Sequence, residues 1–291
     1  MGSTMARRVT LILFALMVVL RAGPAAHAQT AAPSGGPDIV GIRVGIQPQE
    51  AYALLQKLDP AHRVTVAQIG IPVLLGDKEA VYAMAPENLN AGLAETINLS
   101  ITLPPNPQQV FQVHRVLNQT IHTTIDQILA SLRQKYGTES YSSPTGSVNA
   151  LNLVWLYDRK GQLASPAVGA TTMRICSNYF QFAGPGNYPL AAQTLSPGVL
   201  NLPNGITAPY PITQIQDPAK NPQCVGWVRV NGNVIGGLVN GAYTYSLDVT
   251  ISDFDLQKTS AIALSVVLNN AQNQRQQQDL NKAKQQSVPN L

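Results

Sequence analysis

Acidic side chains near the end of the sequence are the clearest candidates for acid–base chemistry. Asp248, Asp253 and Asp255 form the densest acidic cluster, at a predicted junction between a strand and a helix. Two carboxyl groups with different surroundings can divide the roles of general acid and general base, so a hydrolase that uses Asp248 or Asp253 is one hypothesis. Helix capping by Asp253 and compensation of the helix dipole by Asp255 explain these two residues without catalysis, and we favour that interpretation.

The histidines do not form a recognisable metal motif. His114 falls in a predicted strand and His122 at the start of the next predicted helix, whereas His62 stands apart. Two histidines without a nearby Asp, Glu or Cys are a poor zinc ligand set. The sequence also lacks a nucleophile elbow, a phosphate-binding loop and a dinucleotide fingerprint. We therefore expect no metal and no cofactor, and we regard a non-enzymatic function as the better prediction.

Cys176 and Cys224 are the only cysteines in the chain, and we predict that they form a disulfide. A bridge that closes a loop of this length contributes about 4 kcal/mol to stability in the chain-entropy estimate. A redox-active pair is the alternative, but there is no Cys-x-x-Cys motif and no neighbouring His or Lys to activate a thiol.

The segment enclosed by these cysteines is rich in proline and glycine. Residues 184–222 contain eight prolines and four glycines, a composition that cannot sustain a long helix or a central strand. We expect a long loop, pinned at its base by the disulfide. Long loops in compact domains are often functional. We predict that this loop is a contact surface, with Tyr188 and Tyr210 as aromatic binding anchors.

Residues 1–28 have the order of a secretory signal peptide. Arg7 and Arg8 precede an apolar run from Leu11 to Leu20, and small residues follow up to an A-x-A site that ends at Ala28. An N-terminus that stays anchored in a membrane is the alternative. The two arginines leave the twin-arginine route open beside general secretion. We predict a periplasmic or secreted protein, with residues 29–37 as a disordered leader.

Removal of the predicted signal peptide changes the charge balance. Three of the 19 basic residues (Arg7, Arg8 and Arg21) lie in it, so 16 remain against 15 acidic residues. A chain so close to neutrality gives no electrostatic indication of a nucleic-acid partner. We expect the partner to be another envelope protein or a surface polymer, and we expect no transmembrane segment after cleavage.

Hydrophobic periodicity predicts both strands and helices. Helices are expected from Pro48 and from about Ile121 to Gly137, and another from Phe254 onward. Asn231-Gly232 is a dipeptide typical of hairpin turns, and we expect the glycine-rich segment that it opens to be a turn. Trp155 and Trp227 fall in alternating strands, where core packing is the default and a binding cleft the alternative. The predicted strands are residues 64–69, 79–84, 96–103, 110–117, 152–157, 225–230 and 242–251.

These elements predict an α+β fold made of small antiparallel sheets with packed helices. We expect two α/β units plus a C-terminal unit of one strand and one helix. The expected divisions are a tandem α/β region at 38–160, a disulfide-clamped region at 161–271 and a polar helix extension or tail at 272–291.

Part of the first region resembles a known family. The segment from Gly41 to Ala51 (GIRVGIQPQEA) is similar to the start of BamE/SmpA-type modules, and Ile125–Gly137 (IDQILASLRQKYG) is similar to a helix end common in such exported proteins. The family methionine is replaced by Ile46, and the lipoprotein cysteine is absent. The resemblance covers residues 38–160. It implies an exported α/β interaction module that serves envelope assembly or, in tandem form, protein inhibition, without catalytic residues to transfer.

Overall fold

The computed structural model describes residues 36–60, 63–76, 78–86, 95–117, 124–144, 150–181, 216–239 and 242–285. The predicted signal peptide, nearly all of the predicted leader, Tyr188, Tyr210, His62 and His122 lie outside these residues. Within them the strands are β1 (Val64–Gly70), β2 (Glu79–Pro86), β3 (Glu95–Ile101), β4 (Val110–Leu117), β5 (Tyr141–Pro144), β6 (Ala150–Tyr157), β7 (Val228–Val239) and β8 (Ala242–Asp253). The helices are α1 (Pro48–Leu58), α2 (Pro72–Leu75), α3 (Ile125–Tyr136), α4 (Pro166–Cys176) and α5 (Phe254–Gln285), with 3-10 turns η2 (Pro218–Lys220) and η3 (Pro222–Cys224).

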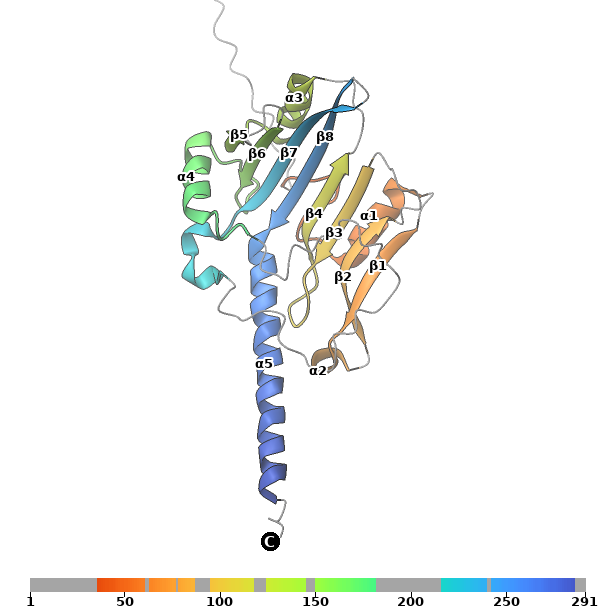
Figure 1. Cartoon of the computed structure of the whole chain (residues 1–291), viewed down its shortest axis with the longest axis vertical. Helices are drawn as coiled ribbons and strands as arrows, with labels where there is room; N and C mark the ends of the chain where they lie inside the picture. The colour runs from red at the N-terminus through yellow and green to blue at the C-terminus, as the bar shows by residue number, and fades with distance from the viewer. Residues whose placement is uncertain are drawn as a thin grey trace, which may run out of the picture. The chain divides into compact units, whose positions relative to one another are not determined.

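The strands form one antiparallel sheet in the order β1-β2-β3-β4-β8-β7-β6-β5 (Figure 1). The prediction of several small sheets is therefore wrong, although the fold is α+β. The two halves join because β4 pairs with β8, from Gln112–Ser252 to Leu117–Leu247. A strand edge exposes unpaired backbone N–H and C=O groups, which pairing with another strand satisfies. Periodicity is a local signal, so it does not report this pairing between distant strands.

The strand order is symmetrical about the junction between β4 and β8. In each half a helix precedes four antiparallel strands that follow one another along the chain: α1 comes before β1–β4, and α3 before β5–β8. Helix α1 begins where it was expected, whereas α3 begins at Ile125, later than the expected start near Ile121. Pro48 is the first residue of α1, and Thr124 caps α3 through a reciprocal pair of hydrogen bonds with Gln127.

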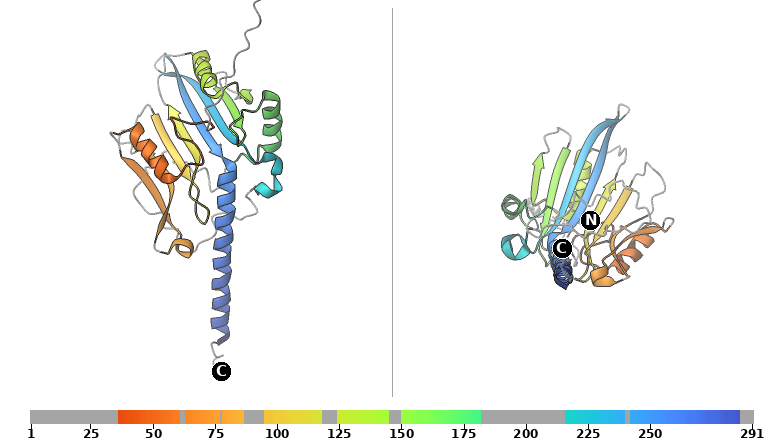
Figure 2. Two further views of the ribbon diagram at one scale, coloured as in Figure 1. Left: turned by 180° about the vertical axis from the view of Figure 1, so that it is seen from behind. Right: turned by 60° about the horizontal axis from the view of Figure 1, so that its bottom comes forward.

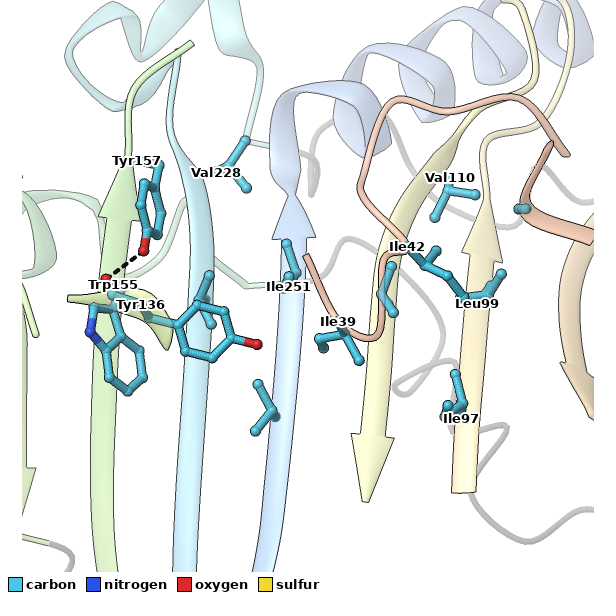
Figure 3. Close-up of a cluster of buried hydrophobic side chains, with 14 of the residues drawn as sticks. Ile39, Ile42, Ile97, Leu99, Val110, Tyr136, Trp155, Tyr157, Val228 and Ile251 are labelled. Carbon is cyan, nitrogen blue, oxygen red and sulfur yellow. Dashed lines mark hydrogen bonds between the residues drawn. The ribbon is translucent and has the colours of Figure 1, made fainter. Parts of the chain in front are cut away.

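One face of the sheet carries most of the core, and we call it the packed face. Helices α1 and α3 and the segment before α1 lie on it, as the view from behind shows (Figure 2). Trp155 and Tyr157 of β6, Tyr136 of α3 and Ile251 of β8 point into this layer (Figure 3). Trp155 is fully buried, and its Nε1 donates to the carbonyl of Gly137 at 2.8 Å. The default expectation of core packing is confirmed for this tryptophan.

A smaller cluster lies on the opposite face, at one end of the sheet. It joins Val154 and Leu156 of β6 to Tyr179, Phe180 and the start of α5. The disulfide between Cys176, at the end of α4, and Cys224 belongs to this cluster, which confirms the predicted pairing. Helix α4 itself was missed, although Ser165-Pro166 is a recognisable start signal.

The expected turn at Asn231-Gly232 is wrong, because both residues lie inside β7. Strand β7 pairs with β8 without interruption from Val228–Asp253 to Val239–Ala242. A Cβ atom on Gly232 would lie 3.2 Å from the ring of Trp155. The glycine therefore makes room for the tryptophan on the neighbouring strand. Glycine occurs in strands at such places as well as in turns.

Helix α5 extends the predicted C-terminal helix through the glutamine-rich segment to Gln285, and residues 272–284 are exposed. No helix among the described residues is both long and apolar enough to cross a bilayer.

Candidate functional site

Asp253 and Asp255 serve the start of α5. The carboxylate of Asp253 accepts hydrogen bonds from the backbone N–H groups of Asp255 and Leu256, both at 3.1 Å, so the predicted helix cap is confirmed. Arg159 forms a two-pronged ion pair with Asp253, and its Nη2 also lies 2.7 Å from Asp255 Oδ2. Asp253 is only 1% exposed. A carboxylate with its lone pairs committed in this way is a structural group.

Asp255 organises the residues around the disulfide. Its carboxylate accepts hydrogen bonds from the hydroxyl of Tyr179 and from the backbone N–H of Gly226, the latter at 2.7 Å. Burial, together with the hydrogen bond to Asp255, raises the pKa of Tyr179. Lys258 is 1% exposed, donates to the carbonyl of Gln181 at 3.1 Å and lies over the Tyr179 ring. Burial lowers the pKa of Lys258 to about 8, against the smaller opposing effect of Asp255.

Asp248 lies elsewhere, and the two carboxylates of the hydrolase hypothesis do not meet. Asp253 lies five positions after Asp248 on β8, a distance of roughly 17 Å along an extended strand. Alternation also places them on opposite sides of β8. Glycosidase carboxylates are ~5–10 Å apart. This pair therefore cannot act on one bond.

Asp248 belongs to a polar layer on the side of the sheet opposite α1 and α3. Along β8, Asp248 and Thr250 alternate with the core residues Val249 and Ile251. In Figure 1 this side faces the viewer, and no described helix lies across β4, β8 and β7 in that view. We call this layer the polar face. It comprises Asn98 and Ser100 of β3, Gln112 and His114 of β4, Asp248, Thr250 and Ser252 of β8, Arg229, Asn231 and Asn233 of β7, and Asn152 of β6.

Strand register aligns the polar face in rows. In the central row Asn98 is paired with His114, His114 with Thr250, and Thr250 with Asn231. Directly opposite residues on neighbouring strands have side chains about 5 Å apart. Four side chains that donate or accept hydrogen bonds thus stand side by side on four strands.

A hydrogen-bond network holds these side chains in place. His114 Nε2 lies 3.0 Å from Asp248 Oδ1, and the Thr250 hydroxyl donates to the same oxygen at 3.4 Å. Arg229 donates to Asn231 Oδ1 at 2.9 Å and to the carbonyl of Phe180 at 3.2 Å. Burial lowers the pKa of Arg229 to about 10. His114 and Asp248 keep side-chain exposures of 26% and 34%, so solvent or a ligand reaches both.

Two polar atoms of this layer are buried without a hydrogen-bond partner in the described part of the chain: Asn152 Oδ1 and Arg229 Nε. An unpaired buried polar atom is costly. Such atoms are rare in native proteins and need an explanation, for which a bound ligand or water is one choice.

The structure tests only some of the remaining residues that the sequence suggested for binding. Tyr188 and Tyr210 lie outside the described residues, so their predicted contact role stays a prediction. Trp227 is half-buried against the disulfide cluster. The polar face itself was missed. Its signal was present in the polar members of the alternating strands, such as Asn98 and Thr250, which were used only to recognise strands.

Among the described residues no three His, Cys, Asp or Glu side chains converge on a point that could hold a metal ion. The chain matches no protein-family profile, no curated protein and no solved structure.

Proposed function

We propose that this protein is a non-catalytic binding module that holds a neutral, hydrogen-bonding polymer against its polar face. The observation that carries the proposal is the central row: Asn98, His114, Thr250 and Asn231 lie in register on four strands that no described helix covers. Amide, imidazole and hydroxyl groups match the hydroxyl and amide groups of an envelope polysaccharide.

The size of the layer favours an extended polymer over a folded partner. Four strands at about 4.8 Å spacing and three rows about 7 Å apart give a patch of roughly 200 Å². A standard protein–protein interface buries about 800 Å² on each side. A few sugar units laid across the strands fit the smaller area. The charge also fits, since Asp248 and Arg229 bring opposite signs to the same layer.

We place this function outside the cytosol. The disulfide between Cys176 and Cys224 supports that location, because such bridges persist in oxidising compartments. The signal-like order of residues 1–28 and the resemblance of Gly41–Ala51 to exported BamE-type modules point to the same compartment. Intact-mass analysis of protein from its native host tests the location. An uncleaved leader, or two thiols that can be alkylated, would contradict it.

Co-sedimentation with peptidoglycan sacculi, and retardation by a neutral polysaccharide in native gels, test the binding function. We expect Asn231→Ala and His114→Ala to weaken retention, each by about fivefold, since each removes a hydrogen-bonding group of the central row. Asn270→Ala, at an exposed position of α5, is the matched control for Asn231→Ala and should bind as the unmodified protein does.

Equal retention of all three variants would refute the polar face as the binding surface. Binding by the unmodified protein to neither polymer would refute the polymer class and favour a protein partner. Cleavage of a bound polymer that is lost in Asp248→Asn would instead support the hydrolase hypothesis.

A further inference from the structure

A cleft lies on the packed face between α3 and the strands β4 and β8. Its volume is about 370 Å³. Ligand sites commonly have volumes of about 300–1,000 Å³, so the cleft is large enough for a small molecule. Its walls are apolar over most of their length and are formed by Ile128 and Leu132 of α3, Leu117 of β4, Leu247 and Val249 of β8, and Ile39.

Two cationic side chains also line this cleft, Arg115 of β4 and Lys135 of α3. Arg115 donates from Nε to Glu95 at 2.7 Å. Among the described residues its terminal nitrogens donate to no other side chain, so they are available to a ligand. Lys135 Nζ lies 3.3 Å from Asp38 Oδ1, a long contact for an ion pair. The side chains of Arg115 and Lys135 are 28% and 42% exposed, so both reach solvent.

Tyr136 connects the cationic end of the cleft to the core. Its hydroxyl donates to the carbonyl of Asp38 at 3.0 Å, which holds the segment before α1 against the cleft. The ammonium of Lys135 lies 5.5 Å from the centre of the Tyr136 ring. Tyr136 packs in turn on Trp155, with ring centres 5.4 Å apart. The cationic end thus lies on buried aromatic residues that are packed in the core.

We propose that this cleft binds a small amphiphile made of one acyl chain and a carboxylate head. The chain lies against Ile128, Leu132 and Val249, and the carboxylate lies between Arg115 and Lys135. The planar guanidinium of Arg115 can donate two parallel hydrogen bonds to a carboxylate. The ligand carboxylate replaces Asp38 as the partner of Lys135. The cleft and the polar face lie on opposite sides of the sheet, so this site is separate from the proposed polymer site.

Equilibrium dialysis of the full-length, disulfide-bonded protein with radiolabelled octanoate and decanoate, both below micelle-forming concentrations, tests the proposal. Each methylene buried in an apolar site tightens binding about fourfold, so decanoate should bind roughly 15-fold more tightly than octanoate. Failure of both acids to bind at millimolar concentration would overturn the proposal. Equal affinity for the two acids would overturn it too, because the chain would then lie outside the cleft.

Two variants of the last turns of α3 separate the head-group site from a general charge effect. Lys135→Gln removes one of the two cleft cations and should weaken decanoate binding about tenfold, with little effect on 1-decanol. Arg133→Gln is the matched control, because Arg133 pairs with Glu139 and does not line the cleft. Equal losses in the two variants would place the acid elsewhere on the surface.

A third variant fills the cleft without removing a core side chain. Ser131 lines the cleft but is exposed, so Ser131→Phe should fold normally, as near-ultraviolet circular dichroism can verify. The new ring should occupy the space of the acyl chain and weaken decanoate binding at least tenfold. Unchanged binding in a folded Ser131→Phe protein would exclude this cleft. None of these outcomes depends on polymer retention by the polar face.

Discussion

The two faces of the sheet use the same strands for different purposes. On the packed face Val249 and Ile251 of β8 enter a core that runs through both halves of the molecule. On the polar face Asp248 and Thr250, which alternate with them along β8, form hydrogen bonds at a surface that solvent reaches. The difference predicts that substitutions on the polar face affect stability less than substitutions on the packed face, because side-chain alternation assigns each residue to one face.

The largest expected effect is on the packed face. Trp155→Ala should lower the free energy of unfolding by about 3–5 kcal/mol, because it leaves a large cavity and an unpaired carbonyl at Gly137. Guanidinium denaturation measures the change. Thr250→Ala, on the polar face, is the comparison and should cost less than about 1 kcal/mol. Similar losses in the two variants would show that both faces contribute equally to stability.

The disulfide cluster tests whether the polar side of the sheet has its own source of stability. Replacement of both Cys176 and Cys224 by Ser should lower the free energy of unfolding by about 2–4 kcal/mol, mainly because the unfolded chain gains freedom. Thermal unfolding at neutral pH, with and without reductant, measures it. A double variant that unfolds at the same temperature as the unmodified protein would mean that the surrounding cluster suffices.

Alkaline pH should act on this same cluster through Lys258. Since the pKa of Lys258 is lowered to about 8, the folded protein binds fewer protons than the unfolded chain between pH 8 and about 10. Stability should therefore rise in this window, by on the order of 1 kcal/mol per pH unit. Above pH 10 the trend should reverse, because burial raises the pKa of Tyr136, Tyr157 and Tyr179.

Urea denaturation at a series of pH values from 7 to 11 measures the free energy of unfolding and so tests both trends. Lys258→Met should abolish the rise between pH 8 and 10 and keep the fall above it. A profile that is flat in the unmodified protein, or a rise that persists in Lys258→Met, would contradict this assignment.

Local features of the fold were predictable from the sequence, whereas long-range ones were not. Residues at helix ends act through contacts only a few positions away, as Pro48, Gly137 and Asp253 do. Their residue types were therefore enough to predict these helix ends. Alternation likewise located the central strands. The meaning of Gly232 depends on Trp155, 77 positions earlier in the sequence, and the turn-like dipeptide therefore misled the prediction.

The candidate site was hidden for the same reason. His114 and Asp248 are 134 residues apart, and they meet only because β4 joins β8. From sequence alone, His114 was expected to bind no metal, and Asp248 was a catalytic candidate only in the hydrolase hypothesis. The register instead pairs the two strands so that the two side chains hydrogen-bond to each other. Pairing between the two halves thus creates the polar face, and no single segment contains it.

The smallest effect is expected from a substitution on the polar face, which is compared with a substitution of the next residue of β8 on the packed face. Asp248→Asn keeps the size of the side chain and its contact with His114, so the free energy of unfolding should change by less than about 0.5 kcal/mol. Val249→Ala, one position later, removes two buried methyl groups and should cost about 2 kcal/mol. Urea titration of both variants measures the difference. If Asp248→Asn proved as destabilising as Val249→Ala, the polar face would be part of the core's support, and its hydrogen bonds would not be available to a ligand.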